Sequence, residues 1–194
     1  MHNNITKIFY FINEFIESDI NKLNRNISII YRNYNKNINK DIIRKIRDYC
    51  KINKRKFYIS YHYNLAIKFK LDGIYVPSFD KRQISNKFSL IKNFEILGSA
   101  HNLNELKIKE KQGCKTIFIS PIFKVKKSNY YLDTIRFNIL ANNTKKNIVA
   151  LGGINDKNIK KLNLTKSIGL ASISLIKKNG LNKFRPFLNF KLKI

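Results

Sequence analysis

Short apolar runs recur along the chain and alternate with longer stretches whose apolar positions follow a helical period. The runs are rich in Ile, Phe, Tyr and Val, which is typical of parallel strands that are buried on both faces. We therefore expect eight strands, at Lys7–Phe11, Ile27–Tyr31, Phe57–Ser60, Gly73–Val76, Glu95–Ser99, Thr116–Ser120, Ile148–Leu151 and Ile168–Ser172.

The stretches between these runs predict helices. Ile42, Ile43 and Ile46 lie on one side of a helix over Asp41–Tyr49. A second helix, Asn102–Gln112, begins at a capping Asn and is followed by a Gly, the residue type that commonly ends helices. Shorter helices are expected at Leu65–Lys70, Asp156–Leu162 and Leu181–Leu188.

Strands that alternate with helices predict a parallel α/β fold. Both a closed (β/α)8 barrel and an open doubly wound sheet fit this alternation, and a chain of 194 residues is short for the barrel. No linker or low-complexity tract interrupts the sequence, so we expect one domain over residues 1–194.

The charge of the chain is strongly positive, with 39 Lys and Arg against 12 Asp and Glu and a formal net charge of +27. Such a balance often marks a protein that binds a polyanion. Here Lys and Asn are abundant together with Ile, Tyr and Phe, all encoded by A/T-rich codons, and the basic residues are spread over nearly every predicted helix. We favour compositional drift over recruitment to nucleic acid, which is not the expected partner.

The sequence also limits where the protein works. No run of 18 or more apolar residues and no secretory signal is apparent, so we expect a cytoplasmic protein with no membrane partner. Cys50 and Cys114 lie far apart and have no His at metal-ligand spacing, which indicates buried core thiols and no zinc site.

A pair of glycines, Gly152 and Gly153, follows the seventh predicted strand and precedes a helix start. Glycine allows backbone to approach a ligand closely, and N–H groups at such a turn suit a phosphate. The eighth strand ends at Ser172, Ile173 and Ser174, and the loops after strands seven and eight form the recurrent anion pocket of (β/α)8 barrels. The alternative that the glycines only make a tight turn stays open.

Four segments together resemble the thiamine phosphate synthase and thiazole tautomerase family, over about Ser28 to Lys178. They are Ser99-Ala100-His101-Asn102, Ser120-Pro121-Ile122-Phe123, Leu151-Gly152-Gly153-Ile154-Asn155 and Asp72-Gly73-Ile74-Tyr75-Val76. The resemblance implies a compact TIM barrel with short helices. Tautomerases carry a His at the position of Pro121, so the synthase branch is the more similar.

What the resemblance implies about function is a transferase of thiamine biosynthesis. In that family the synthase joins hydroxymethylpyrimidine pyrophosphate to thiazole phosphate and releases pyrophosphate, with Mg²⁺ assisting its departure. The expected partners are therefore phosphorylated small molecules, and a homodimer is left open.

The resemblance also assigns residues to the pyrophosphate end of the site. Arg32 matches an arginine that binds the pyrophosphate, whereas the lysine two places on is Tyr34 here, with Lys36 near by. Asp80 matches one of two Mg²⁺ carboxylates. Tyr61 replaces the other, and the neighbouring His62 is interpreted as an ordinary loop residue.

The remaining assignments lie on the later strands. The family's Thr-x-Thr-Lys clamp reads Val125-Lys126-Lys127-Ser128 here. The expected catalytic residues are Arg32, Ser99, Lys126 and Lys127. The expected substrate- and phosphate-binding residues are Arg32, Ser128, Gly152, Gly153, Ile173 and Ser174.

Three functions follow from these observations. The first is an active, divergent synthase in which basic residues offset the missing carboxylate. The second is a catalytically degenerate member that binds a phosphorylated small molecule. The third is a basic protein associated with nucleic acid or a membrane surface, which would show affinity that falls steeply with salt.

Overall fold

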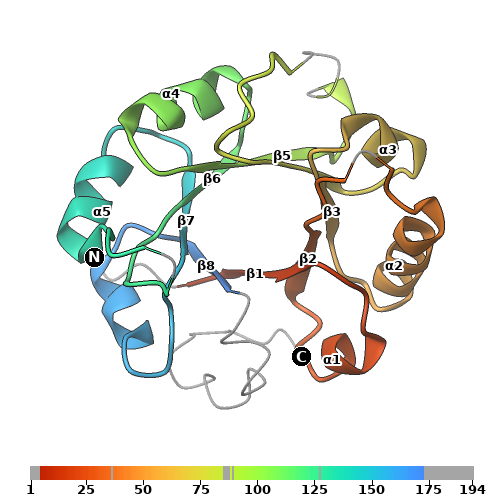
Figure 1. Ribbon diagram of the computed structural model, residues 1–194, viewed down its shortest axis with the longest axis horizontal. Coiled ribbons are helices and arrows are strands. Elements are labelled where there is room, and N and C mark those ends of the chain that lie inside the picture. The colour runs from red at the N-terminus through yellow and green to blue at the C-terminus, as the bar shows by residue number, and fades with distance from the viewer. Residues whose placement is uncertain (1–4, 36, 85–87, 89, 127, 173–194) are drawn as a thin grey trace.

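The protein is a closed barrel of eight parallel strands surrounded by helices (Figure 1). The structure, a computed structural model, describes residues 5–35, 37–84, 88, 90–126 and 128–172. The strands are β1 Lys7–Ile12, β2 Ile27–Tyr31, β3 Phe57–Ser60, β4 Gly73–Val76, β5 Glu95–Ala100, β6 Thr116–Ile119, β7 Asn147–Leu151 and β8 Gly169–Ser172. Each strand pairs with the next along the chain, and β1 also pairs with β8. This closure confirms the (β/α)8 barrel and excludes the open sheet.

The helices lie outside the ring of strands (Figure 1). They are α1 Glu17–Asn21, α2 Lys40–Ile52, α3 Tyr63–Lys68, α4 Leu103–Lys111, α5 Asp133–Ala141 and the 3-10 helix η2 Ile159–Leu164. The connection between β4 and β5 contains no α-helix among its described residues. The helices are short, as expected for a barrel of this chain length.

The predicted elements agree closely with the observed ones, with one difference in type. At α4, the side chain of Asn102 accepts a hydrogen bond from the Glu105 N–H, as predicted for a capping residue. The predicted α-helix over Asp156–Leu162 is instead a 3-10 helix that begins at Ile159. The side chains of Asn155 and Asn158 bind the backbone before it and hold a turn there. The predicted helix at Leu181–Leu188 lies outside the described residues.

The interior of the barrel is filled by large side chains, mostly aromatic. It contains Phe9, Phe11, Ile30, Tyr58, Tyr75, Leu97, Phe118, Val149 and Ala171. Ring centroids lie 4.9 Å apart for Phe9 and Phe118 and 5.1 Å apart for Phe11 and Tyr75, both at edge-to-face angles. Because side chains fill the interior, a ligand has no room to bind inside the barrel.

A second core lies between the strands and the surrounding helices and includes Ile43 and Ile46 of α2, as their spacing predicts. Cys50 and Cys114 are buried, and burial raises the pKa of each thiol to about 12. Both are therefore inert thiols. No helix in the described part of the chain combines the length and apolar character needed to cross a lipid bilayer.

Candidate active site

The loops that follow parallel strands all open on the rim at the carboxyl ends of the strands. The predicted residues that lie on this rim are Arg32, Asp80, Ser99, Lys126, Ser128, Gly152 and Gly153. β7 and β8 pair in parallel, with Leu151 opposite Ala171, so the turns after both strands share this rim. The predicted residues Lys127, Ile173 and Ser174, and also Lys36, lie outside the described residues.

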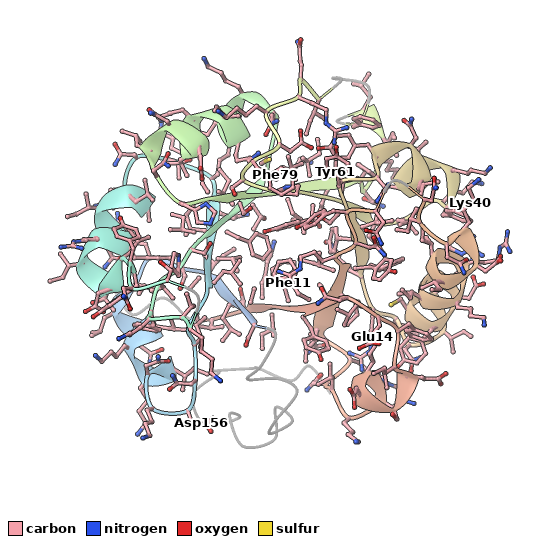
Figure 2. All side chains as sticks on the ribbon, in the orientation of Figure 1. Phe11, Glu14, Lys40, Tyr61, Phe79 and Asp156 are labelled. Atoms are coloured by element: carbon pink, nitrogen blue, oxygen red, sulfur yellow. The ribbon has the colours of Figure 1, made fainter. Side chains whose placement is uncertain are left out.

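Arg32 directly follows β2 and lies above the aromatic interior. Its guanidinium carbon is 5.8 Å from the centroid of the Phe11 ring, and its Nε donates to Asn13 Oδ1 at 3.2 Å. Figure 2 shows Phe11 near the centre of the ring of strands. Arg32 forms no ion pair with a carboxylate of the described residues. Its charge is therefore available to an anion at the mouth of the barrel.

Ser99 lies near the carboxyl end of β5 and is buried. Burial raises the pKa of Tyr75, and a hydrogen bond with Ser99 opposes that rise. The two hydroxyls lie near the carboxyl ends of β4 and β5, next to the packed interior. Ser99 therefore lies at the carboxyl-end rim of the barrel, where its predicted catalytic role stays a prediction.

The Gly152–Gly153 turn adopts a conformation that favours glycine, with φ of 91° and 71°. A Cβ atom on Gly153 would lie 2.3 Å from the carbonyl oxygen of Phe123 and 2.6 Å from that of Lys124. The turn therefore packs directly against the backbone of the loop after β6. This close approach explains why glycine is required at position 153, and it makes the interpretation as a tight turn partly correct.

In this turn the carbonyl groups are hydrogen-bonded, whereas the N–H groups have no partner among the described residues. The carbonyl oxygens of Leu151, Gly152 and Gly153 accept from Ile122 N, Phe123 N and Asn158 Nδ2 at 2.9, 3.1 and 2.9 Å. The N–H groups of Gly152, Gly153 and Ile154 have no partner among the described residues. Among the described residues the turn therefore has three N–H donors without a partner, which is the property that a phosphate site needs.

The loop after β6 carries the described part of the lysine-rich segment. Val125 and Ser128 pair as an isolated bridge, so the segment is a tight turn. The Ser128 hydroxyl accepts from Tyr130 N at 3.1 Å, and Lys126 is exposed to solvent. Gly152 and Gly153 pack on residues 121–125 of this loop, and Lys126 and Ser128 follow that segment directly in the chain.

Asp80 is the most completely enclosed charged group at the rim, with a side chain that is 1% exposed. The Arg82 guanidinium binds it in a bidentate manner, from Nε to Oδ1 at 2.9 Å and from Nη2 to Oδ2 at 2.7 Å, and the Tyr63 hydroxyl also donates to Oδ2. Burial alone would raise the pKa of the Asp80 carboxyl, but the hydrogen bonds from Arg82 and Tyr63 hold it below its ordinary value. The carboxylate is ionised and fully partnered.

The side chains around Asp80 do not fit Mg²⁺, which needs several oxygen ligands around one site. Both Asp80 oxygens are engaged by Arg82 and Tyr63, and Tyr61 stands where the resemblance places the other carboxylate. Among the residues that the structure describes, no group of three or more His, Cys, Asp or Glu could hold a metal ion. We therefore assign no catalytic step to a metal held by these side chains.

Sequence reasoning missed the aromatic part of the rim. Tyr34 lies 6.2 Å from Tyr61 and 5.4 Å from Phe79 between ring centroids, and Phe79 is 60% exposed. Figure 2 shows Tyr61 and Phe79 next to each other. Arg82, which packs against Tyr61, was also missed, although its place two residues after Asp80 could have suggested an ion pair.

His62, which follows Tyr61, behaves as an ordinary loop residue in this structure. Its Nε2 lies 3.0 Å from the carbonyl oxygen of Asn33, and burial lowers its pKa. The contact joins the loop after β3 to the loop after β2. His62 therefore helps to hold two parts of the rim together.

Comparisons with known proteins identify similar sequences. The thiamine-phosphate synthase of Methanococcus vannielii is 30% identical over 122 residues, which cover 62% of this chain and 59% of that protein. The thiamine-phosphate synthase of Prochlorococcus marinus is 30% identical over 136 residues, 69% of this chain and 38% of that protein. The chain thus spans less than two thirds of the length of both relatives.

The fold has a close counterpart among solved structures. Thiamine phosphate pyrophosphorylase from Pyrococcus furiosus superposes with a TM-score of 0.71 at 19% identity, over 90% of this chain and 89% of that one. A sequence model of the family described as thiamine monophosphate synthase matches residues 21–176, which include seven of the eight strands and every loop discussed above. This chain belongs to the thiamine monophosphate synthase family.

Proposed function

We propose that this protein forms thiamine phosphate from hydroxymethylpyrimidine pyrophosphate and thiazole phosphate, with release of pyrophosphate. The observation that carries the proposal is the presence of two anion-binding features on one rim. The N–H groups of the Gly152–Gly153 turn, which have no partner among the described residues, suit a phosphate monoester, and the guanidinium of Arg32, which forms no ion pair there, suits the pyrophosphate.

The reaction breaks the bond between the pyrimidine methylene carbon and a pyrophosphate oxygen, and the electron pair leaves with the pyrophosphate. The thiazole nitrogen then supplies the electron pair for the new carbon–nitrogen bond. Arg32 would stabilise the charge that develops on the leaving group. The glycine turn would hold the thiazole phosphate so that the ring nitrogen faces the methylene carbon.

The aromatic interior of the barrel would also contribute to the step in which the pyrophosphate leaves. Phe11 and Tyr75 form the top of the packed interior, directly below Arg32 and beside Ser99. These side chains would form an apolar floor beneath the reacting carbon, and the solid interior would keep water from entering below it. Lys126 and Ser128 directly follow the segment on which the glycine turn packs, and they would add positive charge and a hydroxyl to the phosphate site.

Arg32→Gln tests this proposal in an assay with both substrates that measures thiamine phosphate. We expect a loss of about tenfold or more in kcat/KM, because a charge-assisted contact to the leaving group is removed. Arg25→Gln, an exposed residue before the other end of β2, is the matched control and should leave the rate unchanged. Equal activity of the Arg32→Gln variant and the wild type would contradict the proposal.

A second function, binding without catalysis, is favoured by one observation. The two positions that the resemblance assigns to Mg²⁺ are Tyr61 and a fully partnered Asp80. A degenerate member would bind thiazole phosphate at the Gly152–Gly153 turn and form no thiamine phosphate. Calorimetric titration with thiazole phosphate, followed by the assay with both substrates, separates the two functions.

A further inference from the structure

We propose that the Arg82 guanidinium takes the place of a divalent cation at this rim and binds a diphosphate group without a metal ion. The inference rests on the proposed function, because it concerns the pyrophosphate end of the same site. It starts from the disagreement between the expected Mg²⁺ and the side chains that occupy its position. Asp80, the only carboxylate that the resemblance retains there, is bound to Arg82.

The position of the guanidinium is fixed from several directions. Besides its bidentate contact with Asp80, its central carbon lies 4.2 Å from the Tyr61 ring centroid and 4.7 Å from that of Tyr63. Nη2 also lies 3.4 Å from the carbonyl oxygen of Tyr61. Tyr61 itself has φ of 71°, an unusual conformation for a bulky residue that turns its backbone at the end of β3. A cation held this firmly is preorganised for an anion.

The backbone around Arg82 is anchored from behind by α4 and the residue that follows it. The buried Lys109 donates from Nζ to the carbonyl oxygen of Asp80 at 2.7 Å. Gln112 donates from Nε2 to the carbonyl oxygens of Asp80 and Arg82 at 3.0 and 2.7 Å. These bonds satisfy the carbonyls of the loop and keep the segment from shifting when a ligand binds.

The outer side of the guanidinium is open. The Arg82 side chain is 50% exposed, and its Nη1 has no hydrogen-bond partner among the described residues. It lines a cavity of about 640 Å³ together with Lys40, His62, Asn37 and Asn64. No carboxylate is among the described residues that line this cavity, so it offers N–H donors and positive charge to an anion.

The pairing with Asp80 determines what the site can hold. Asp80 offsets the single positive charge of the guanidinium and fixes its fork, so the pair contributes oriented N–H donors that point away from the carboxylate. On the cavity wall, Lys40 supplies a positive charge, and Asn37 and Asn64 add amide N–H donors. Together these groups match the multiple negative charges of a diphosphate and leave no open ligand set for a metal.

The test is calorimetric binding of inorganic pyrophosphate in the presence of EDTA. We expect the wild type to bind under these conditions and Arg82→Gln to weaken the affinity by about tenfold or more. Lys81→Gln removes the adjacent, exposed positive charge and should change the affinity by less than about twofold, since exposed charges interact weakly through water. Binding by the wild type only after Mg²⁺ is added, or unchanged affinity of Arg82→Gln, would overturn the inference.

Arg82→Gln leaves the buried Asp80 carboxylate without its partner and could unfold the loop. The double variant Asp80→Asn with Arg82→Gln removes both charges, and a thermal melt checks that it folds. It should lose pyrophosphate binding in EDTA to the same extent, and wild-type affinity in a folded double variant would overturn the inference.

The inference and the proposed function fail in different ways. Metal-free pyrophosphate binding that depends on Arg82, without turnover of both substrates, would support the inference and contradict the proposed function. Turnover that requires Mg²⁺ and is unchanged in Arg82→Gln would support the proposed function and overturn the inference.

Discussion

Gly153 shows how a residue without a side chain shapes the rim of the barrel. It combines φ of 71° with a close approach to the carbonyl oxygens of Phe123 and Lys124. Gly113, after α4, has a similar φ of 77°, but a Cβ atom there would meet only Ile96 Cδ1, at 3.9 Å. A substitution at Gly113 would therefore introduce backbone strain alone, whereas one at Gly153 would introduce both strain and a steric clash.

We predict that Gly153→Ala destabilises the protein more than Gly113→Ala does. Strain alone should cost about 1 kcal/mol at Gly113, whereas the clash at Gly153 adds a displacement of the loop after β6 and raises the loss to about 3 kcal/mol. Urea unfolding of the two variants measures the difference. An equal loss of unfolding free energy in the two variants would contradict the prediction, because it would mean that the loop after β6 moves aside without an energetic penalty.

Glu95 is a charged residue at the opposite rim, at the start of β5. It forms an ion pair with Lys56 and accepts from the Tyr58 hydroxyl at 3.2 Å. Burial alone would raise the pKa of Glu95, but the hydrogen bond and charge of Lys56, with help from Lys7 and Tyr58, hold it below its ordinary value of 4.5. The ionised carboxylate therefore stabilises the folded state.

We predict that Glu95→Gln lowers the free energy of unfolding at neutral pH by about 1–3 kcal/mol. The stabilisation is fully present above the ordinary pKa and is lost as the pH falls through the depressed value of the folded state, so the gap between the variant and the wild type should close in acid. Urea unfolding over a pH series measures it. Glu14→Gln, an exposed residue in no ion pair of the described chain, should show no such closing gap, and a Glu95→Gln gap independent of pH would contradict the prediction.

Among the elements, α4 does more than cover the barrel. Lys109, on α4, and Gln112, its C-cap residue, reach the carbonyl oxygens of the loop after β4, which has no α-helix of its own in the described residues. The helix thus replaces the support that a helix between β4 and β5 would give. Burial lowers the pKa of Lys109, since its ammonium group is enclosed.

We predict that Gln112→Leu loosens this loop and costs about 1–3 kcal/mol, because the carbonyls of Asp80 and Arg82 lose a donor. Hydrogen exchange at the amides of residues 80–82 should become faster, and the metal-free affinity for pyrophosphate should fall with it. Lys111→Leu, an exposed change on the same helix, is the control. Unchanged exchange in Gln112→Leu would show that Lys109 alone anchors the loop.

At the scale of the whole molecule, positive charges far outnumber negative ones, which gives a net charge of +27. Like charges over one small barrel repel one another, and salt screens the repulsion over a Debye length of about 8 Å at physiological ionic strength. We predict that the Tm rises by several degrees as NaCl increases from about 10 to about 150 mM. A Tm that does not change over this range would show that the basic residues are spaced too widely to repel.

The sequence predicted the strands well because apolar runs are a local signal. Barrel closure depends on the pairing of β1 with β8, which is not local, and only the combined motifs favoured it. The glycine turn was predicted from its place after a strand. The roles of Arg82 and Tyr63 could not be predicted, because the sequence does not show which partners enclose Asp80. The early residues of the predicted helix over Asp156–Leu162 form a turn instead, because Asn155 and Asn158 bind the backbone there.

The contact between the turn after β7 and the loop after β6 has a consequence for how the family can vary. At Gly153 the nearest atoms belong to the main chain of Phe123 and Lys124, which every amino acid possesses. Side-chain changes at Phe123 and Lys124 therefore leave this close contact in place, although burial in the core constrains Phe123 separately. The exposed positions of the loop after β6, such as Lys126 and Ser128, can therefore vary without altering the packing of the glycine turn.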